Sequence, residues 1–140
     1  MTAYLIQAHS IVYDSANDQY LVYGDYFETD QSPRRNFLLE VRSDFSEQRI
    51  TTFGCKDFSQ YGGCNVFAKQ VFALSTGKKI LINEKHAYID YTLTDPGVLI
   101  LDSNSQIENN LWFLKSDTFC LLATKQNHHH WLSLTYRQLD

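Results

Sequence analysis

The sequence predicts a mainly β protein built as an antiparallel meander, and three features support this prediction. Apolar and polar residues alternate with period two in several segments, as in strands that have one buried face. Turn-forming residues separate these segments at short intervals, which is typical of hairpin-connected strands. Long helical patterns are missing between them, and this argues against a parallel α/β sheet. We therefore expect about nine to ten strands.

The expected strands are of two kinds. Three segments alternate and are predicted to be half-buried: 37–42, 86–93 and 132–137. Four segments are continuous apolar runs, typical of strands buried on both faces: 20–23, 98–101, 111–114 and 119–123. Turns are expected between them at residues 15–18 and 44–47, and at Asp95-Pro96-Gly97, where Pro presets the turn angle and Gly accepts a positive φ.

Residues 65–75 are compatible with either a helix or a strand. Ala68, Val71 and Leu74 recur at three-residue spacing, and Gly77 follows where a helix C-cap would lie. A short helix here would make the fold α+β and would cover one end or face of the sheet. A strand would leave the protein all-β.

The 140 residues are expected to form a single domain, 1–140. A sandwich, a barrel and a half-propeller-like array all remain open, because inward alternation is common to these architectures. The sequence shows no repeat with a fixed period, although recurring hairpins are compatible with the propeller-like option.

Charge is distributed unevenly along the chain. Five acidic residues and no lysine or arginine precede Arg34. The basic residues beyond that point form pairs rather than a stripe, so nucleic-acid binding is not expected. Apolar runs are too short to span a membrane, and the absence of a signal-like start predicts a cytoplasmic protein whose three cysteines are reduced.

Tyrosines are interleaved with the acidic residues of this first stretch. Tyr combines apolar area with a hydroxyl in protein interfaces, and acidic neighbours attract a basic partner. The predicted partner-binding residues are Asp14, Asp18, Tyr20, Tyr23, Asp25, Tyr26, Glu28 and Asp30. The leading hypothesis is therefore a small soluble binding protein, analogous in size and charge to immunity-type stoichiometric inhibitors that neutralise a basic partner such as a nuclease toxin.

Two further hypotheses come from other functional classes. A β-barrel or sandwich lined by Phe and Tyr could carry a small apolar ligand. A Cys–His hydrolase would use Cys64, placed at the start of a helix over 65–75, with His86 or His128 as the base. The run His128-His129-His130 lacks a nearby third ligand type, so we expect no metal, and no cofactor motif is present. On balance the sequence favours a protein that is not an enzyme.

Overall fold

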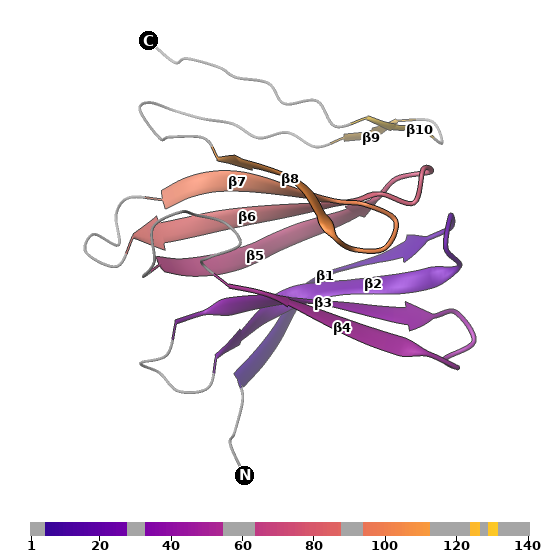
Figure 1. The fold of residues 1–140 in the computed structure, drawn as a ribbon, viewed down its shortest axis with the longest axis horizontal. Helices are drawn as coiled ribbons and strands as arrows, with labels where there is room; N and C mark the ends of the chain where they lie inside the picture. The colour runs from indigo at the N-terminus through magenta and orange to yellow at the C-terminus, as the bar shows by residue number, and fades with distance from the viewer. Residues whose placement is uncertain are drawn as a thin grey trace.

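The computed structural model describes residues 5–27, 33–54, 64–87, 94–112, 124–126 and 129–131. Its strands form two four-stranded antiparallel meanders and a short hairpin (Figure 1). The first meander comprises β1 (Leu5–Asp14), β2 (Gln19–Phe27), β3 (Arg35–Arg42) and β4 (Gln48–Phe53). The second comprises β5 (Cys64–Ala73), β6 (Lys79–Ala87), β7 (Thr94–Leu101) and β8 (Ile107–Trp112). The hairpin comprises β9 (Thr124–Gln126) and β10 (His129–Trp131).

The predicted mainly β, antiparallel meander is confirmed, and the helical alternative at 65–75 is wrong for the described residues 64–73. This segment is β5, and a bulge explains its helix-like spacing. The register of β5 against β6 shifts between Ala68 and Gln70, so one extra residue enters the strand. Residues facing the core are therefore separated by three positions across the bulge, from Ala68 to Val71, and by two elsewhere.

The turn expected at Asp95-Pro96-Gly97 is also corrected, because these residues lie inside β7. Pro96 pairs with Glu84 of β6, whereas pairing with β8 begins only at Gly97, opposite Trp112. Pro96 thus occupies a part of the strand that has a described neighbour on one side only. Proline is tolerated in such edge-like positions because its missing N–H is not needed by a second ladder.

The two meanders share a bulge in their first strand and positive φ values in their turns. The bulge of β1 follows Ala8 and the bulge of β5 follows Ala68, sixty residues further along. Residues with a positive φ stand at matching turn positions. Asp18 in the first meander corresponds to Gly77 in the second, and Phe45 corresponds to Ser105. A tandem structural repeat is therefore present, although the sequence shows no periodic motif.

Each bulge also carries an equivalent acid–base pair. In the first meander His9 Nε2 lies 2.8 Å from Asp25 Oδ2 of β2. In the second meander Lys69 Nζ lies 2.7 Å from Glu84 Oε2 of β6. The bulge aims both basic side chains at the neighbouring strand, so the repeat extends from backbone geometry to side-chain chemistry.

The meanders stack head to tail. Matching the bulges makes Ile80 the equivalent of Leu21, because Ala8 lies opposite Gly24 and Ala68 lies opposite Asn83. We call the face that carries Leu21 or Ile80 the distal face, and the opposite one the proximal face. The distal face of the first meander packs on the proximal face of the second in one core: Leu21, Tyr23, Leu38 and Phe53 against Val66, Ala68, Val71, Ala73, Leu81, Leu99 and Leu101.

The distal face of the second meander is buried as well. Ile80, Ile82 and Val98 form a second cluster with Phe72, Leu74 and Ile100 packed against it. In Figure 1 the β9–β10 hairpin lies beyond the second meander, on the side away from the first. The described strands therefore form two packed, open four-stranded sheets and a short hairpin, with no closed barrel among them. None of the described residues forms a helix long and apolar enough to cross a membrane.

Side chains of the first meander complete the hydrogen bonding of β5. This strand lies at the edge of its sheet, so the N–H groups on its outer side have no neighbouring strand to accept their hydrogen bonds. Asp25 Oδ1 accepts from the Ala68 N–H at 2.6 Å, and Ser10 Oγ accepts from the Val71 N–H at 3.2 Å. The buried Tyr23 hydroxyl donates to Asn83 of the second meander. Polar contacts thus fix the two layers in register.

Candidate functional site

The proximal face of the first meander is the candidate site, because it is apolar and exposed to solvent. We call it the open face. Strand pairing places its side chains on one side of the sheet: Ile6, Ala8, Ile11, Tyr13, Tyr20, Val22, Tyr26, Phe37, Leu39 and Ile50. Ile6, Ile11 and Ile50 are 64%, 68% and 62% exposed. Isoleucines this exposed on one contiguous sheet face are typical of an interaction surface rather than of a solvated one.

The open face contains a shallow apolar groove of about 540 Å³. Residues from all four strands of the meander line it, among them Ile6 from β1, Tyr26 from β2, Leu39 from β3 and Ile50 from β4. Phe37 forms its floor and is itself 8% exposed. The groove can therefore accept apolar side chains from a partner across the full width of the sheet.

A row of aromatic rings extends the open face towards the turns. The Tyr13 and Tyr20 ring centroids are 5.4 Å apart and tilted by 53°. Phe45, from the turn between β3 and β4, stacks on Tyr20 at 6.5 Å. Phe45 is 77% exposed, which is unusual for such a large apolar side chain. Rigid aromatic groups that are already held in place lose little conformational entropy when they bind a partner.

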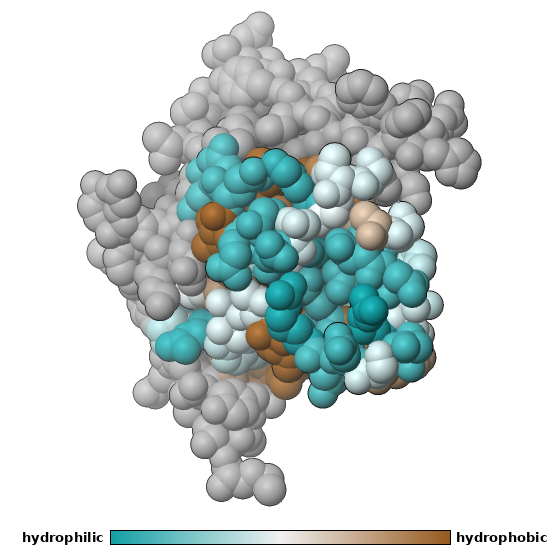
Figure 2. Space-filling view, turned by 45° about the vertical axis from the view of Figure 1, so that its right-hand side comes forward, coloured by the Kyte–Doolittle hydropathy of each residue, from teal (hydrophilic) through white to brown (hydrophobic). Residues whose placement is uncertain are grey.

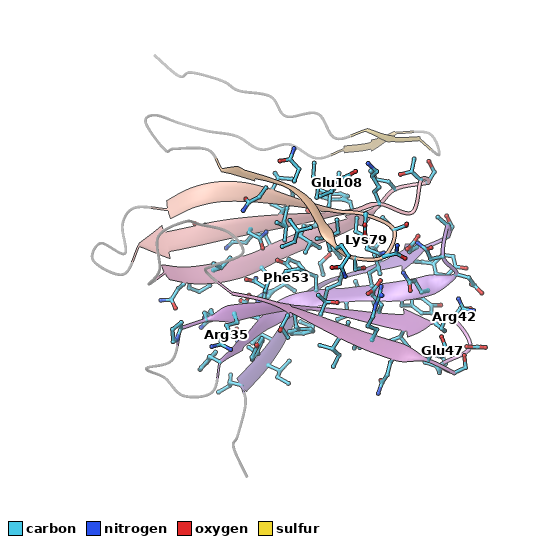
Figure 3. All side chains as sticks on the ribbon, in the orientation of Figure 1. Arg35, Arg42, Glu47, Phe53, Lys79 and Glu108 are labelled. Atoms are coloured by element: carbon cyan, nitrogen blue, oxygen red, sulfur yellow. The ribbon has the colours of Figure 1, made fainter. Side chains whose placement is uncertain are left out.

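The turn end of the molecule is polar and differs from the open face. Hydrophilic residues dominate it in Figure 2. A groove of about 750 Å³ at this end is lined by residues of both charges, including Asp18, Arg42, Glu47 and Arg49. Figure 3 shows Arg42 and Glu47 on the outer turn and Lys79 further inside, between the layers. The mixed charges give this groove no single electrostatic preference.

Several predicted partner-binding residues lie inside the protein. Asp14, Tyr23 and Asp25 are buried, so they are unavailable to a partner in the described structure. The reason is strand alternation: in β2, Leu21, Tyr23 and Asp25 point to the core, whereas Tyr20, Val22 and Tyr26 point to the open face. Asp14 is held in the first turn by the side chains of Asn17 and Gln19.

The remaining predicted residues divide into two groups. Tyr20, Tyr26 and Asp18 are at least partly exposed, and the two tyrosines lie on the open face. Glu28 and Asp30 lie outside the described residues.

Sequence reasoning missed the isoleucines of the open face. Ile6 and Ile11 are an odd number of positions apart, so simple alternation assigns them to opposite faces, and only the bulge after Ala8 brings them together.

The enzymatic hypothesis loses the helix on which it depended. Cys64 is the first residue of strand β5, where no helix dipole would stabilise a thiolate. Cys55, Cys120 and His128 lie outside the described residues. Within the part of the chain that the structure describes, no three His, Cys, Asp or Glu side chains are grouped to hold a metal ion.

Comparison with known protein families, with curated proteins and with solved structures finds no match to this chain.

A hydrogen bond at the edge of the open face gives a testable pKa change. Tyr13 Oη donates to Asp18 Oδ1 at 2.6 Å, and this bond, with help from the Ser43 side chain, lowers the pKa of Asp18. We expect Tyr13→Phe to raise that pKa towards its ordinary value of about 3.9. Because a lowered folded-state pKa stabilises the protein above that ordinary value, the wild type should lose this contribution as the pH falls through the pKa of Asp18, and the variant should lose less.

NMR titration of the side-chain carboxyls measures this change directly. Asp44 is the internal control, because the Ser46 side chain, not Tyr13, lowers its pKa. An Asp18 titration curve that is identical in wild type and Tyr13→Phe would rule out the hydrogen bond as the cause.

Proposed function

We propose that this protein is a protein-binding module whose contact surface is the open face. The single observation that supports the proposal is the exposure of the three isoleucines Ile6, Ile11 and Ile50 on one continuous sheet face. The other three faces of the two four-stranded sheets contribute to apolar cores. Burying one exposed Ile side chain contributes about 1.5 to 3 kcal/mol, so a partner that covers all three gains substantial affinity.

Immunity-type inhibition of a basic partner is the form of protein binding that we propose for this surface. Asp18 and Asp44 lie beside the aromatic row, and hydrogen bonds lower the pKa of both carboxyl groups. Both are therefore ionised at neutral pH and would favour the approach of a basic protein. The apolar groove would then supply most of the affinity, with charge acting mainly on the association rate.

The proposal is tested by cross-linking pull-down from the native host with matched Ile→Glu variants. Ile50→Glu places a charge in the open face, whereas Ile107→Glu makes the same change at an exposed position on β8 of the second meander. A partner retained by the wild type and Ile107→Glu but lost by Ile50→Glu supports the proposed surface. Equal recovery by all three proteins would place the contact elsewhere. Weaker recovery at high salt would support a basic partner.

A further inference from the structure

Phe45 occupies a turn position that is unusual for a large aromatic residue. Its φ is 61°, in the left-handed region that bulky side chains rarely adopt. The turn itself does not require phenylalanine, since the equivalent position of the second meander holds Ser105 with a φ of 62°. Phe45 is also 77% exposed, so its ring adds nothing to the core. An exposed ring held in such a conformation points to a role in binding.

The ring of Phe45 belongs to a fixed group of three, the aromatic row, which consists of Tyr13, Tyr20 and Phe45. Phe45 stacks on Tyr20 with an angle of 17° between the ring planes, and Tyr20 in turn contacts Tyr13. The β1–β2 and β3–β4 turns lie at the same end of the first meander (Figure 1), and the Ser43 N–H joins them by donating to the Asp18 carbonyl at 3.1 Å. The row is therefore held together before any partner binds.

Two carboxylates lie beside the aromatic row. Asp18 accepts a hydrogen bond from Tyr13 Oη at 2.6 Å. Asp44 Oδ1 accepts from both the N–H and the hydroxyl of Ser46. An ionised carboxylate has about four acceptor sites, so each can accept further hydrogen bonds from a partner. The Arg42 charge acts on both carboxylates but offsets only one of them, which leaves net negative charge beside the exposed rings.

The protein already contains one arginine that is held by rings and a carboxylate. The Arg34 guanidinium lies 4.8 Å from the ring centroid of Phe27 and 4.7 Å from that of Phe67. Its Nη1 is 3.5 Å from Asp25 Oδ2. The aromatic row presents the same two kinds of group at the surface, and no cation of the described residues lies over its rings.

From this combination we propose that the aromatic row, with Asp18 and Asp44, is a docking site for an arginine side chain of the basic partner. The guanidinium lies on the exposed ring of Phe45 and donates to the Asp44 carboxylate, while Asp18 adds negative charge. This inference rests on the proposed function, since it names the side chain that the open face recognises at its turn end. Arginine fits better than lysine, because a planar guanidinium stacks on a ring and pairs with a carboxylate, whereas an ammonium is a strongly hydrated point charge.

NMR titration of the full chain with N-acetyl-arginine methylamide tests the site in the absence of the partner. We expect saturable shifts in the signals of Phe45, Tyr20 and Asp44, and weaker binding of the corresponding blocked lysine. Phe45→Asn removes the ring and keeps a residue that tolerates positive φ, so it should weaken arginine binding about two- to fivefold. Asp44→Asn keeps an oxygen for Ser46 and should weaken binding by up to about fivefold.

The control variant is Glu108→Gln, which removes a carboxylate that is 43% exposed on β8 of the second meander. It should bind blocked arginine as the wild type does, and circular dichroism checks that all variants keep the fold. Equal affinity of the wild type for blocked arginine and blocked lysine would overturn the proposal. So would arginine binding that Phe45→Asn leaves unchanged.

The pull-down distinguishes failure of this inference from failure of the proposed function. A partner that is lost by Ile50→Glu but fully retained by Phe45→Asn and Asp44→Asn would overturn the arginine site alone. A partner recovered equally by Ile50→Glu and the wild type would overturn the proposed function, whereas the titration tests arginine binding without any partner.

Discussion

Replacing Asp25 with alanine is expected to lower the free energy of unfolding by about 3 to 5 kcal/mol, because several buried donors lose their acceptor together. Asp25 is 1% exposed. Its Oδ1 accepts from the Ala68 N–H at 2.6 Å and from Asn36 Nδ2 at 3.2 Å. Its Oδ2 accepts from His9 Nε2 at 2.8 Å and faces Arg34 Nη1 at 3.5 Å. The carboxylate therefore joins β1, β2 and β3 to the edge of the second meander.

Urea denaturation of two variants at neutral pH measures this effect against a control. Asp44→Ala also removes a carboxylate with two hydrogen bonds, both to Ser46, but this turn is exposed to solvent and water can replace the lost acceptor. We expect Asp44→Ala to cost far less than Asp25→Ala. If Asp25→Ala does not fold, Asp25→Asn, which keeps an oxygen for the Ala68 N–H, should give an intermediate loss. Equal stability of Asp25→Ala and Asp44→Ala would show that Asp25 does not link the meanders.

This role of Asp25 could not be predicted from the sequence. Acidic residues are usually exposed, and the concentration of acids before Arg34 favoured a charged surface. Burial of a carboxylate depends on partners that are distant in the chain, here the Ala68 N–H, 43 residues away. Of the predicted set, Tyr20 and Tyr26 do lie on the open face, because strand alternation gave them the same direction and gave Tyr23 and Asp25 the opposite one.

The β class, in contrast, was predictable from local patterns. Alternation over residues 37–42 corresponds to β3, and the apolar run at 98–101 corresponds to the part of β7 that is buried on both faces. These signals survive because each strand buries its side chains by the same period-two rule. The rule fails at the bulges, where one extra residue reverses the direction of every side chain that follows.

The tandem repeat could not be predicted from the sequence, because equivalent positions of the two meanders carry side chains of different chemical types. Tyr20 is exposed on the open face, whereas its equivalent Lys79 is fully buried. Glu40 corresponds to Ile100, and one is charged while the other is apolar. What the two meanders share is the position of a bulge and the sign of φ in their turns, which many different residues can satisfy.

The divergence at Lys79 leads to the second large expected effect. Lys79 is 0% exposed, and its Nζ lies 3.2 Å from Glu40 Oε1 of the first meander while donating to the Ser103 carbonyl at 3.0 Å. Lys79→Met would leave Glu40 buried with one cation fewer. We expect a loss of about 2 to 4 kcal/mol, less than the full cost of isolating a buried charge because Arg49 still faces Glu40 at 2.7 Å.

The neighbouring lysine provides a closely matched control. Lys78 also forms an ion pair, with Glu108 at 2.7 Å, but both side chains are 43% exposed. Solvent screens this pair, so Lys78→Met should cost no more than about 1 kcal/mol. Added salt should reduce the effect of Lys78→Met further and leave that of Lys79→Met nearly unchanged, because salt screens exposed pairs far more than buried ones. Similar losses for the two variants in urea denaturation would mean that the Lys79–Glu40 pair does not hold the two meanders together.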